Sequence, residues 1–253
     1  MVTPPYFFGV RDSFEPIQEN AFATQGWLNH CRALIQSWKQ WPPSPLFAAP
    51  KHFCEPVRRI LEIYHMKERI RILDLGGGFG DNFFYLKRAL GGLTDKIEYH
   101  VVDNKLQCDL GRDFYGSDNK TIKFHESIPH YKYDLTLLIG TLQYIDEWRN
   151  TVREVMKITA DSIFISRSPI RIDGPTFITI QSVCPARGPS SLRKIGEANV
   201  AVIRESELDN LLQNNSFKIK TSVLHENYSR NFSRLPELYR NVMYIDKHYL
   251  RGD

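Results

Sequence analysis

The chain has 253 residues and a net charge of +4; 42% of its residues are hydrophobic and 25% are charged. This length and composition are typical of one globular α/β domain with an N-terminal extension. The charge is spread without a Lys/Arg block, and neither an 18-residue apolar run nor a signal-like leader occurs, which argues against nucleic-acid partners, a membrane span and secretion. The four cysteines lie far apart without a C-x-x-C pair, so we expect reduced cytoplasmic thiols and no metal site: Cys31, Cys54, Cys108 and Cys184.

The N-terminal part precedes the first buried strand, and we assign it to residues 1–68. Residues 1–26 lack periodicity and predict an irregular arm, whereas Trp27–Gln40 carries apolar residues at helical spacing and ends at the proline-rich segment 41–45. A second helix is expected from Glu55 to about Met66. These two helices could cover the substrate or simply cap the sheet.

A glycine-rich turn stands between a strand and a helix. Ile70–Leu75 is a short apolar run, and Asp81–Leu90 has a helical pattern that ends at two glycines. Between them lie four glycines within five residues: Gly76, Gly77, Gly78 and Gly80. Glycine allows left-handed backbone angles and leaves the amides at the helix N-terminus open to a ligand, so this turn predicts a nucleotide-binding site.

The glycine spacing separates two cofactor classes. A dinucleotide fingerprint requires G-x-G-x-x-G, and the sixth position counted from Gly76 or from Gly78 is not glycine. An NAD(P)-dependent oxidoreductase is therefore disfavoured. Asp74 followed by alternating Gly76, Gly78 and Gly80 resembles the first motif of class I S-adenosylmethionine (SAM) methyltransferases. The resemblance implies that the glycines, with Gly77, lie against the methionine part of SAM and that Asp74 helps to hold its amino group; the alternative is a turn that only packs strand against helix.

The next strand ends in an acid. Ile97–Asp103 reads as a strand, and the helix expected over Lys105–Phe114 follows it. Asp103 stands 23 residues after Gly80, which suits a carboxylate that accepts hydrogen bonds from ribose hydroxyls.

A third short strand is expected over Thr121–His125. The resemblance places Glu126 and Ser127, which follow it, beside the adenine ring. His125 is a candidate general base, although a lone histidine at a strand end is more often structural.

The most apolar strand, Tyr133–Gly140, suggests a central position in a parallel sheet. It continues into a loop that resembles the fourth methyltransferase motif, which lies beside the reactive methyl group. This implies that Thr141 contacts the cofactor and that Gln143 and Tyr144 are catalytic candidates, where many small-molecule methyltransferases carry histidines.

An unusually long segment separates Arg167 from the helix expected over Glu205–Gln213. Its composition favours an ordered insertion at about 167–204, at the sheet edge where ligands bind in open α/β folds. Arg167 offers a planar donor fork for a phosphate or carboxylate, and Gln181 can bind sugar hydroxyls. We therefore expect the acceptor between the 142–144 loop and this insertion, with Arg167 both binding and aligning it; local pairing is the alternative for Arg167, Gln143 and Gln181.

The remaining elements complete a Rossmann-like α/β fold. A helix is expected over Glu147–Lys157 and a strand over Ser162–Ser166. Phe217–Leu224 and Tyr239–Tyr244 would supply a final antiparallel pair. The prediction is a mostly parallel seven-stranded sheet with helices on both faces, within a SAM-binding domain over 69–253.

Five short motifs narrow the resemblance: Leu73–Gly80, Val101–Asp103, Leu142–Ile145, Arg167–Pro169 and Thr179–Gln181. This set resembles a bacterial methyltransferase family often encoded among surface-polysaccharide genes, although residues 189–193 depart from its pattern. The resemblance implies methyl transfer from SAM to a small or glycan-linked acceptor, such as a sugar hydroxyl. A catalytically inactive binding protein with the same fold remains the alternative outside catalysis.

Overall fold

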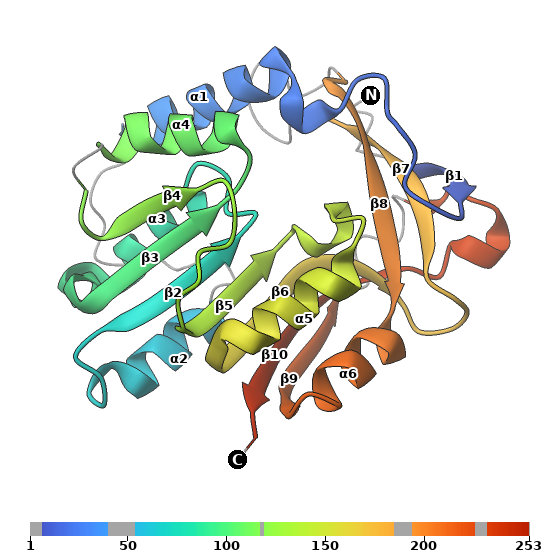
Figure 1. Cartoon of the computed structure of the whole chain (residues 1–253). Coiled ribbons are helices and arrows are strands. Elements are labelled where there is room, and N and C mark those ends of the chain that lie inside the picture. Colours follow the sequence, from blue (N-terminus) through green and yellow to red (C-terminus); the bar gives the residue numbers. More distant parts are fainter. Residues whose placement is uncertain (1–6, 40–53, 117–118, 185–193, 226–231, 253) are drawn as a thin grey trace.

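A computed structural model describes residues 7–39, 54–116, 119–184, 194–225 and 232–252, which form one ten-stranded sheet flanked by helices (Figure 1). The strands are β1 Phe7–Arg11, β2 Ile70–Leu75, β3 Ile97–Val102, β4 Ile122–His125, β5 Tyr133–Ile139, β6 Thr159–Arg171, β7 Phe177–Val183, β8 Gly196–Arg204, β9 Phe217–His225 and β10 Met243–Arg251. The α-helices are α1 Gln25–Lys39, α2 Cys54–Tyr64, α3 Asp81–Leu90, α4 Lys105–Tyr115, α5 Trp148–Ile158 and α6 Glu205–Gln213. Short 3₁₀ helices are η1 Ala21–Ala23, η3 Gly91–Lys96, η4 Leu142–Tyr144 and η6 Glu237–Tyr239.

Seven strands form the sheet that the sequence predicts. Their order is β4, β3, β2, β5, β6, β10, β9, and β10 alone runs in the opposite direction to the other six strands. The predicted position of the last strand was wrong, because Tyr239 belongs to η6 and the strand extends over Met243–Arg251. The Rossmann-like, mostly parallel fold is confirmed.

β6 belongs to two parts of the sheet, and it is longer than predicted. Its first half pairs with β5 up to Ser166, and its end pairs with β8 at Ile170 and Arg171. Between the two halves, Arg167 adopts a φ of +55° and the register with β10 shifts, which marks a β-bulge. The strand resumes after this bulge and carries the chain into the insertion.

The insertion is a hairpin of β7 and β8, to which the N-terminal strand β1 adds antiparallel. These three strands splay away from the parallel strands on the right of Figure 1. The predicted irregular arm was therefore wrong for Phe7–Arg11. Gly9, at a φ of +68°, and a register shift between Phe8 and Val10 interrupt the alternation that would have indicated a strand.

Two apolar layers hold the helices on the sheet. α2 and α3 bury residues such as Ile60 and Phe83 against one face, and α5 and α6 bury Trp148 and Leu208 against the other. Trp148 is almost fully enclosed, so its truncation to alanine would cost about 3–5 kcal/mol. α1 lies along α4 above one end of the sheet (Figure 1).

Candidate functional site

The four glycines of the β2–α3 loop are required for different reasons. Gly76, Gly78 and Gly80 have positive φ angles of 72°, 56° and 89°. A Cβ at Gly76 would lie 2.2 Å from Thr141 Cγ2, and one at Gly77 would lie 2.3 Å from Asp74 Oδ2. At Gly78 the nearest atom would be Asp81 Oδ1 at 3.4 Å, an ordinary contact. The chain therefore fills the space around Gly76 and Gly77, whereas Gly78 has room beside it for a ligand.

Asp74 lies beneath this loop and is 1% exposed. Its carboxylate accepts hydrogen bonds from Tyr99 Oη at 2.7 Å and from Asn82 Nδ2 at 3.1 and 3.2 Å. Burial raises its pKa to about 7. Asp74 thus supports the loop from below, and its direct contact with a cofactor stays a prediction.

Asp103 joins the second predicted cofactor segment to the first. Its Oδ2 accepts the Gly78 N–H at 2.9 Å, while Oδ1 accepts the N–H and the side-chain amide of Asn104 at 2.7 and 2.9 Å. Burial raises the pKa of this carboxyl. A carboxylate has about four acceptor positions, so Oδ2 keeps a second lone pair, and its contact with a ribose hydroxyl stays a prediction.

Asp81 and Gln107 complete this end of the site, and the sequence analysis missed both as site residues. Burial raises the pKa of Asp81 to about 6. Gln107 is 3% exposed, and its Nε2 has no hydrogen-bond partner in the described part of the chain. A Cβ on Gly78 would lie 3.8 Å from Gln107 Oε1, so this amide lies beside the loop. The sequence signal was weak: an acid directly after Gly80, and a polar residue on the buried face of a helix.

Helix α1 reaches this cluster through Cys31. The thiol donates to Gln107 Oε1 at 3.8 Å, and burial, followed by the charge of Asp81, raises its pKa to about 12. α1 therefore lies close to the glycine loop. This position suits a cover over the site, and that role of the N-terminal helices stays a prediction.

The adenine candidates and Thr141 lie at the same edge of the sheet. Glu126 and Ser127 are exposed and directly follow β4. Thr141 follows β5 and donates to the carbonyl oxygens of Gly76 at 3.2 Å and Ile139 at 3.3 Å. Thr141 thus fixes the glycine loop to β5, and the cofactor contacts of all three residues stay predictions.

His125 is paired with another histidine. Its Nε2 lies 3.0 Å from His100 Nδ1, and the two rings stack with centroids 5.0 Å apart. Burial lowers the pKa of His125, and the positive charges of Lys123 and Arg112 lower it further. Among the described contacts none links His125 to Gln143, Tyr144 or Arg167, so its role as a base stays untested and its visible role is structural.

The segments expected to flank the acceptor contact each other directly. Gln143 is 5% exposed; it accepts from Ser168 Oγ at 3.2 Å, and its Nε2 lies 3.5 Å from the Arg167 carbonyl oxygen. Tyr144 Oη donates to Gln181 Oε1 at 2.7 Å. The two glutamines are thus engaged in joining η4 to β6 and β7.

Arg167 is the exposed polar group at this junction. No described residue hydrogen bonds to its guanidinium, while its N–H donates to Asp246 Oδ1 at 3.2 Å. Its charge lowers the pKa of Asp81 and of Tyr144, both of which burial raises. Arg167 therefore lies close enough to both the glycine loop and η4 for its charge to act on them, and its contact with an acceptor stays a prediction.

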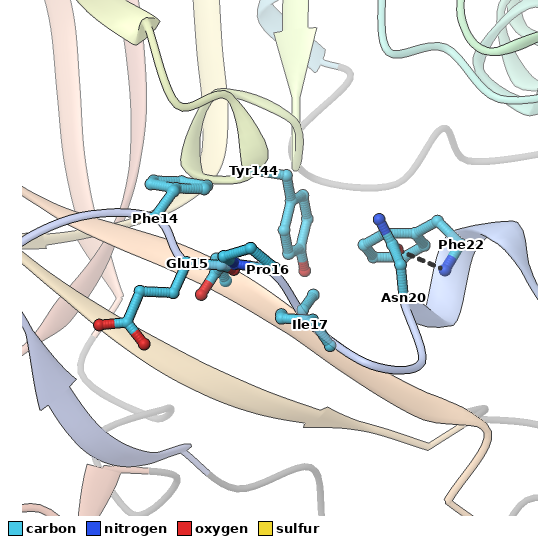
Figure 2. Close-up of a pocket in the computed structure, with 9 residues that line it drawn as sticks. Phe14, Glu15, Pro16, Ile17, Asn20, Phe22 and Tyr144 are labelled. Atoms are coloured by element: carbon cyan, nitrogen blue, oxygen red, sulfur yellow. Dashed lines mark hydrogen bonds between the residues drawn. The ribbon is translucent and has the colours of Figure 1, made fainter.

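A pocket of about 270 Å³ opens beside Tyr144 (Figure 2). It lies between the N-terminal arm, η4 and β8, and Figure 2 shows the Tyr144 ring pointing from η4 toward the arm. Phe22 meets that ring edge-on at 4.8 Å. Aromatic, aliphatic and amide side chains and one carboxylate line it: Phe14, Glu15, Pro16, Ile17, Asn20, Phe22, Tyr144, Ala198 and Asn199.

The described residues contain no group of three or more His, Cys, Asp or Glu side chains that could hold a metal ion. None of their helices is long and apolar enough to cross a membrane.

Comparison with known proteins identifies the fold. Neither a family model nor a curated protein matches the chain. Among solved structures, the (4+2)-cyclase SpnF aligns over 96% of this chain and 99% of its own, with a TM-score of 0.54 and 13% identity. Magnesium protoporphyrin IX methyltransferase (ChlM) from Synechocystis PCC 6803, with bound S-adenosylhomocysteine (SAH), aligns over 91% and 96%, with a TM-score of 0.53 and 10% identity.

A third structure, the N-terminal domain of EvdMO1 in the presence of SAH and D-fucose, aligns over 92% of this chain and 100% of its own, with a TM-score of 0.50 and 13% identity. At these identities the likeness shows the fold alone. The chain thus has the fold of class I SAM-dependent methyltransferases, and the cyclase shows that proteins with this fold differ in reaction.

Proposed function

We propose that the protein is a SAM-dependent methyltransferase that acts on a hydroxyl of a small or glycan-linked acceptor. The observation that carries the proposal is the convergence of three carboxylates, Asp74, Asp81 and Asp103, on the glycine loop. The charges of Asp81 and Asp103 both raise the pKa of Asp74, whose largest shift comes from burial. The loop therefore keeps acidic groups close together where water solvates them poorly.

The three carboxylates at the glycine loop favour binding of SAM and disfavour binding of a dinucleotide. The amino and sulfonium groups of SAM are cations, which carboxylates stabilise. A dinucleotide would place its pyrophosphate at the N-terminus of the helix after the loop, where Asp81 is the first residue of α3. Two like charges in that position would repel, so the proposal disfavours NAD(P).

The residues present fit SAM in specific roles. The free lone pair of Asp103 Oδ2 would accept from the ribose, and the unpartnered Nε2 of Gln107 would donate to the cofactor beside Gly78. When bound, SAM supplies a methyl carbon already activated by its sulfonium. The protein then has to hold the acceptor in line with that carbon and exclude water, and we assign this task to Arg167, Tyr144 and α1.

A saccharide acceptor is supported by four observations. Arg167 offers a free planar fork for a phosphate or carboxylate, as a nucleotide sugar or acidic glycan would carry. The pocket beside Tyr144 combines rings with the amides of Asn20 and Asn199. The short motifs resemble a family encoded among surface-polysaccharide genes, and one structural neighbour was crystallised with a sugar.

Methyl transfer can be tested by mixing the protein with methyl-labelled SAM and a panel of nucleotide sugars, sugar phosphates and oligosaccharides. We expect a labelled product and stoichiometric SAH with at least one hydroxyl acceptor. Binding of SAM without SAH release for any acceptor would favour the non-catalytic alternative. Methylation restricted to amines would retain the enzyme class and refute the hydroxyl acceptor.

A further inference from the structure

His225 and Asp246 form a close side-chain pair next to the Arg167 bulge. His225 ends β9, and its Nε2 lies 2.6 Å from Oδ2 of Asp246 on β10. The other carboxylate oxygen, Oδ1, accepts the Arg167 N–H at 3.2 Å and the hydroxyl of Ser166. One carboxylate thus connects the imidazole to the residue that we place against the acceptor.

The bulge itself indicates a constrained site. Arg167 is one of two non-glycine residues with positive φ in the described chain, a conformation that costs free energy and persists only where its surroundings hold it. Asp246 supplies that support by accepting the Arg167 N–H. Since the same carboxylate contacts His225, it holds the imidazole ring next to the backbone of Arg167.

The strand register places the pair at the binding edge of the sheet. β5 ends where Ile139 pairs with Ser166, whereas His225 pairs with Tyr244, which itself pairs with Pro169 three residues farther along β6. His225 therefore lies beyond the end of β5. Tyr244 and Tyr144 both pack against one apolar cluster, which brings the start of β10 toward the pocket side of η4.

We propose that His225 is the general base of the methyl transfer, with Asp246 as the residue that positions its ring. This role rests on the function proposed above and gives the transfer a base whose ring is held by a carboxylate. With its proton on Nε2, the imidazole donates to Asp246 and presents the Nδ1 lone pair, which accepts no hydrogen bond from a described residue. The His225 side chain is 31% exposed, so part of the ring is accessible to solvent.

The proton balance is complete without a further reactant. A lone pair of the acceptor oxygen forms the new O–CH₃ bond while the S–CH₃ bond breaks and its electron pair stays on sulfur, which gives SAH. The hydroxyl proton passes to Nδ1, and the resulting imidazolium is stabilised by Asp246. The proton then leaves to solvent through the exposed edge of the ring.

The tautomer can be tested without knowing the acceptor. In ¹⁵N-labelled protein at pH 8, we expect the His225 resonances, assigned by comparison with His225→Gln, to show a protonated Nε2 and an unprotonated Nδ1. Asp246→Asn should disturb this preference, whereas Ser166→Ala, which removes another donor to the same carboxylate, should keep it. A proton on Nδ1 in the wild-type protein would overturn the proposal.

Catalysis supplies the second test, with the labelled-SAM assay and the saccharide panel described above. We expect His225→Gln to lower kcat by about 100-fold or more, the usual size of a general-base contribution, with SAM affinity by calorimetry within about threefold of wild type. His65→Gln, an exposed histidine elsewhere, is the matched control. Wild-type turnover in His225→Gln, or methylation of amines but no hydroxyl, would refute the base while leaving the methyltransferase intact. Failure of the wild-type protein to bind SAM would instead overturn the proposed function, and this role with it.

Discussion

The two ends of the candidate site are built in different ways. The cofactor end, which comprises the glycine loop with Asp103 and Gln107, comes from one continuous segment of two βα units. The acceptor end, which comprises η4, the Arg167 bulge and the surrounding strands, is assembled from segments spread between Phe7 and Asp246. The first end is determined by local sequence and the second by long-range pairing.

This difference also appears in how the polar groups are used. At the cofactor end, Asp74 and Asp103 have hydrogen-bond partners inside the chain, and we propose that a ligand uses the space beside Gly78, the second lone pair of Asp103 Oδ2 and the Nε2 of Gln107. At the acceptor end, Gln143 and Gln181 hold the scaffold together, and Arg167 is left exposed. We therefore expect substitutions at the cofactor end to lower SAM affinity and substitutions at the acceptor end to lower the rate of methyl transfer.

The largest effect is expected from Gly78→Val. Its branched side chain would fill the space beside the loop, so SAM binding should fall by more than about 100-fold, or over 2.7 kcal/mol. Gly91→Val is the matched control, because Gly91 also has a positive φ and a Cβ there would have no atom within 4 Å. Calorimetry and circular dichroism on both variants check this. Equal loss of affinity in both would mean that backbone strain, and not the ligand space, is responsible.

Substitutions at the acceptor end should instead lower turnover. Arg167→Gly removes the guanidinium but keeps a residue that tolerates the positive φ of the bulge. We expect about a 100-fold loss of kcat/KM with unchanged SAM affinity, since an interaction with the acceptor and not the cofactor is lost. Gln143→Ala should also lower kcat/KM, because it removes the amide that contacts the Arg167 carbonyl oxygen. Unchanged turnover in both variants would move the acceptor elsewhere.

Asp103→Ala tests whether the Asp103 carboxylate binds the ribose of SAM. A hydrogen bond to a charged group contributes about 1.5–3 kcal/mol, so SAM should bind about 10- to 100-fold more weakly. Asp109→Ala, which removes an exposed carboxylate from α4, is the control. An affinity within about threefold of wild type for Asp103→Ala would limit that carboxylate to holding the Gly78 amide.

A smaller effect is expected from pH. The pKa of Asp81 is about 6 and that of Asp74 about 7, both raised mainly by burial. Lowering the pH from 8 to 5.5 protonates these carboxyls and removes the charge that attracts a cationic cofactor, so SAM affinity should fall by about tenfold. Titrations at several pH values test this, and an affinity that rises on acidification would contradict it.

The same shift predicts an opposite effect on the cofactor-free protein. The pKa of Asp74 rises from 3.8 to about 7 on folding, so its contribution to stability is present below pH 4 and is lost as the pH rises through 7. Asp74→Asn should therefore raise the Tm at pH 8 by a few degrees and weaken SAM binding. Thermal melts at pH 5 and pH 8 measure this; a lower Tm for the variant at pH 8 would show that its hydrogen bonds to Tyr99 and Asn82 outweigh the buried charge.

The contrast between the two ends explains what the sequence could predict. β2 and α3 were placed at their observed bounds because an apolar run, a glycine turn and a helical pattern are local signals. The position of Asp103 at the end of the next strand was also predicted from local sequence, whereas its hydrogen bond to the Gly78 N–H was not. By contrast, β1 and the pairing of His225 with Asp246 depend on contacts across the sheet between distant segments, which periodicity does not encode. The extension of β6 was missed because Arg167 and Pro169 interrupt the pattern of a strand that a bulge allows to continue.

The most direct test of the central claim is a calorimetric titration of the wild-type protein at pH 8 with SAM and, in parallel, with NAD⁺. The convergence of Asp74, Asp81 and Asp103 on the glycine loop predicts a one-to-one complex with SAM and no measurable heat of binding with NAD⁺. Binding of NAD⁺ in place of SAM would contradict the account.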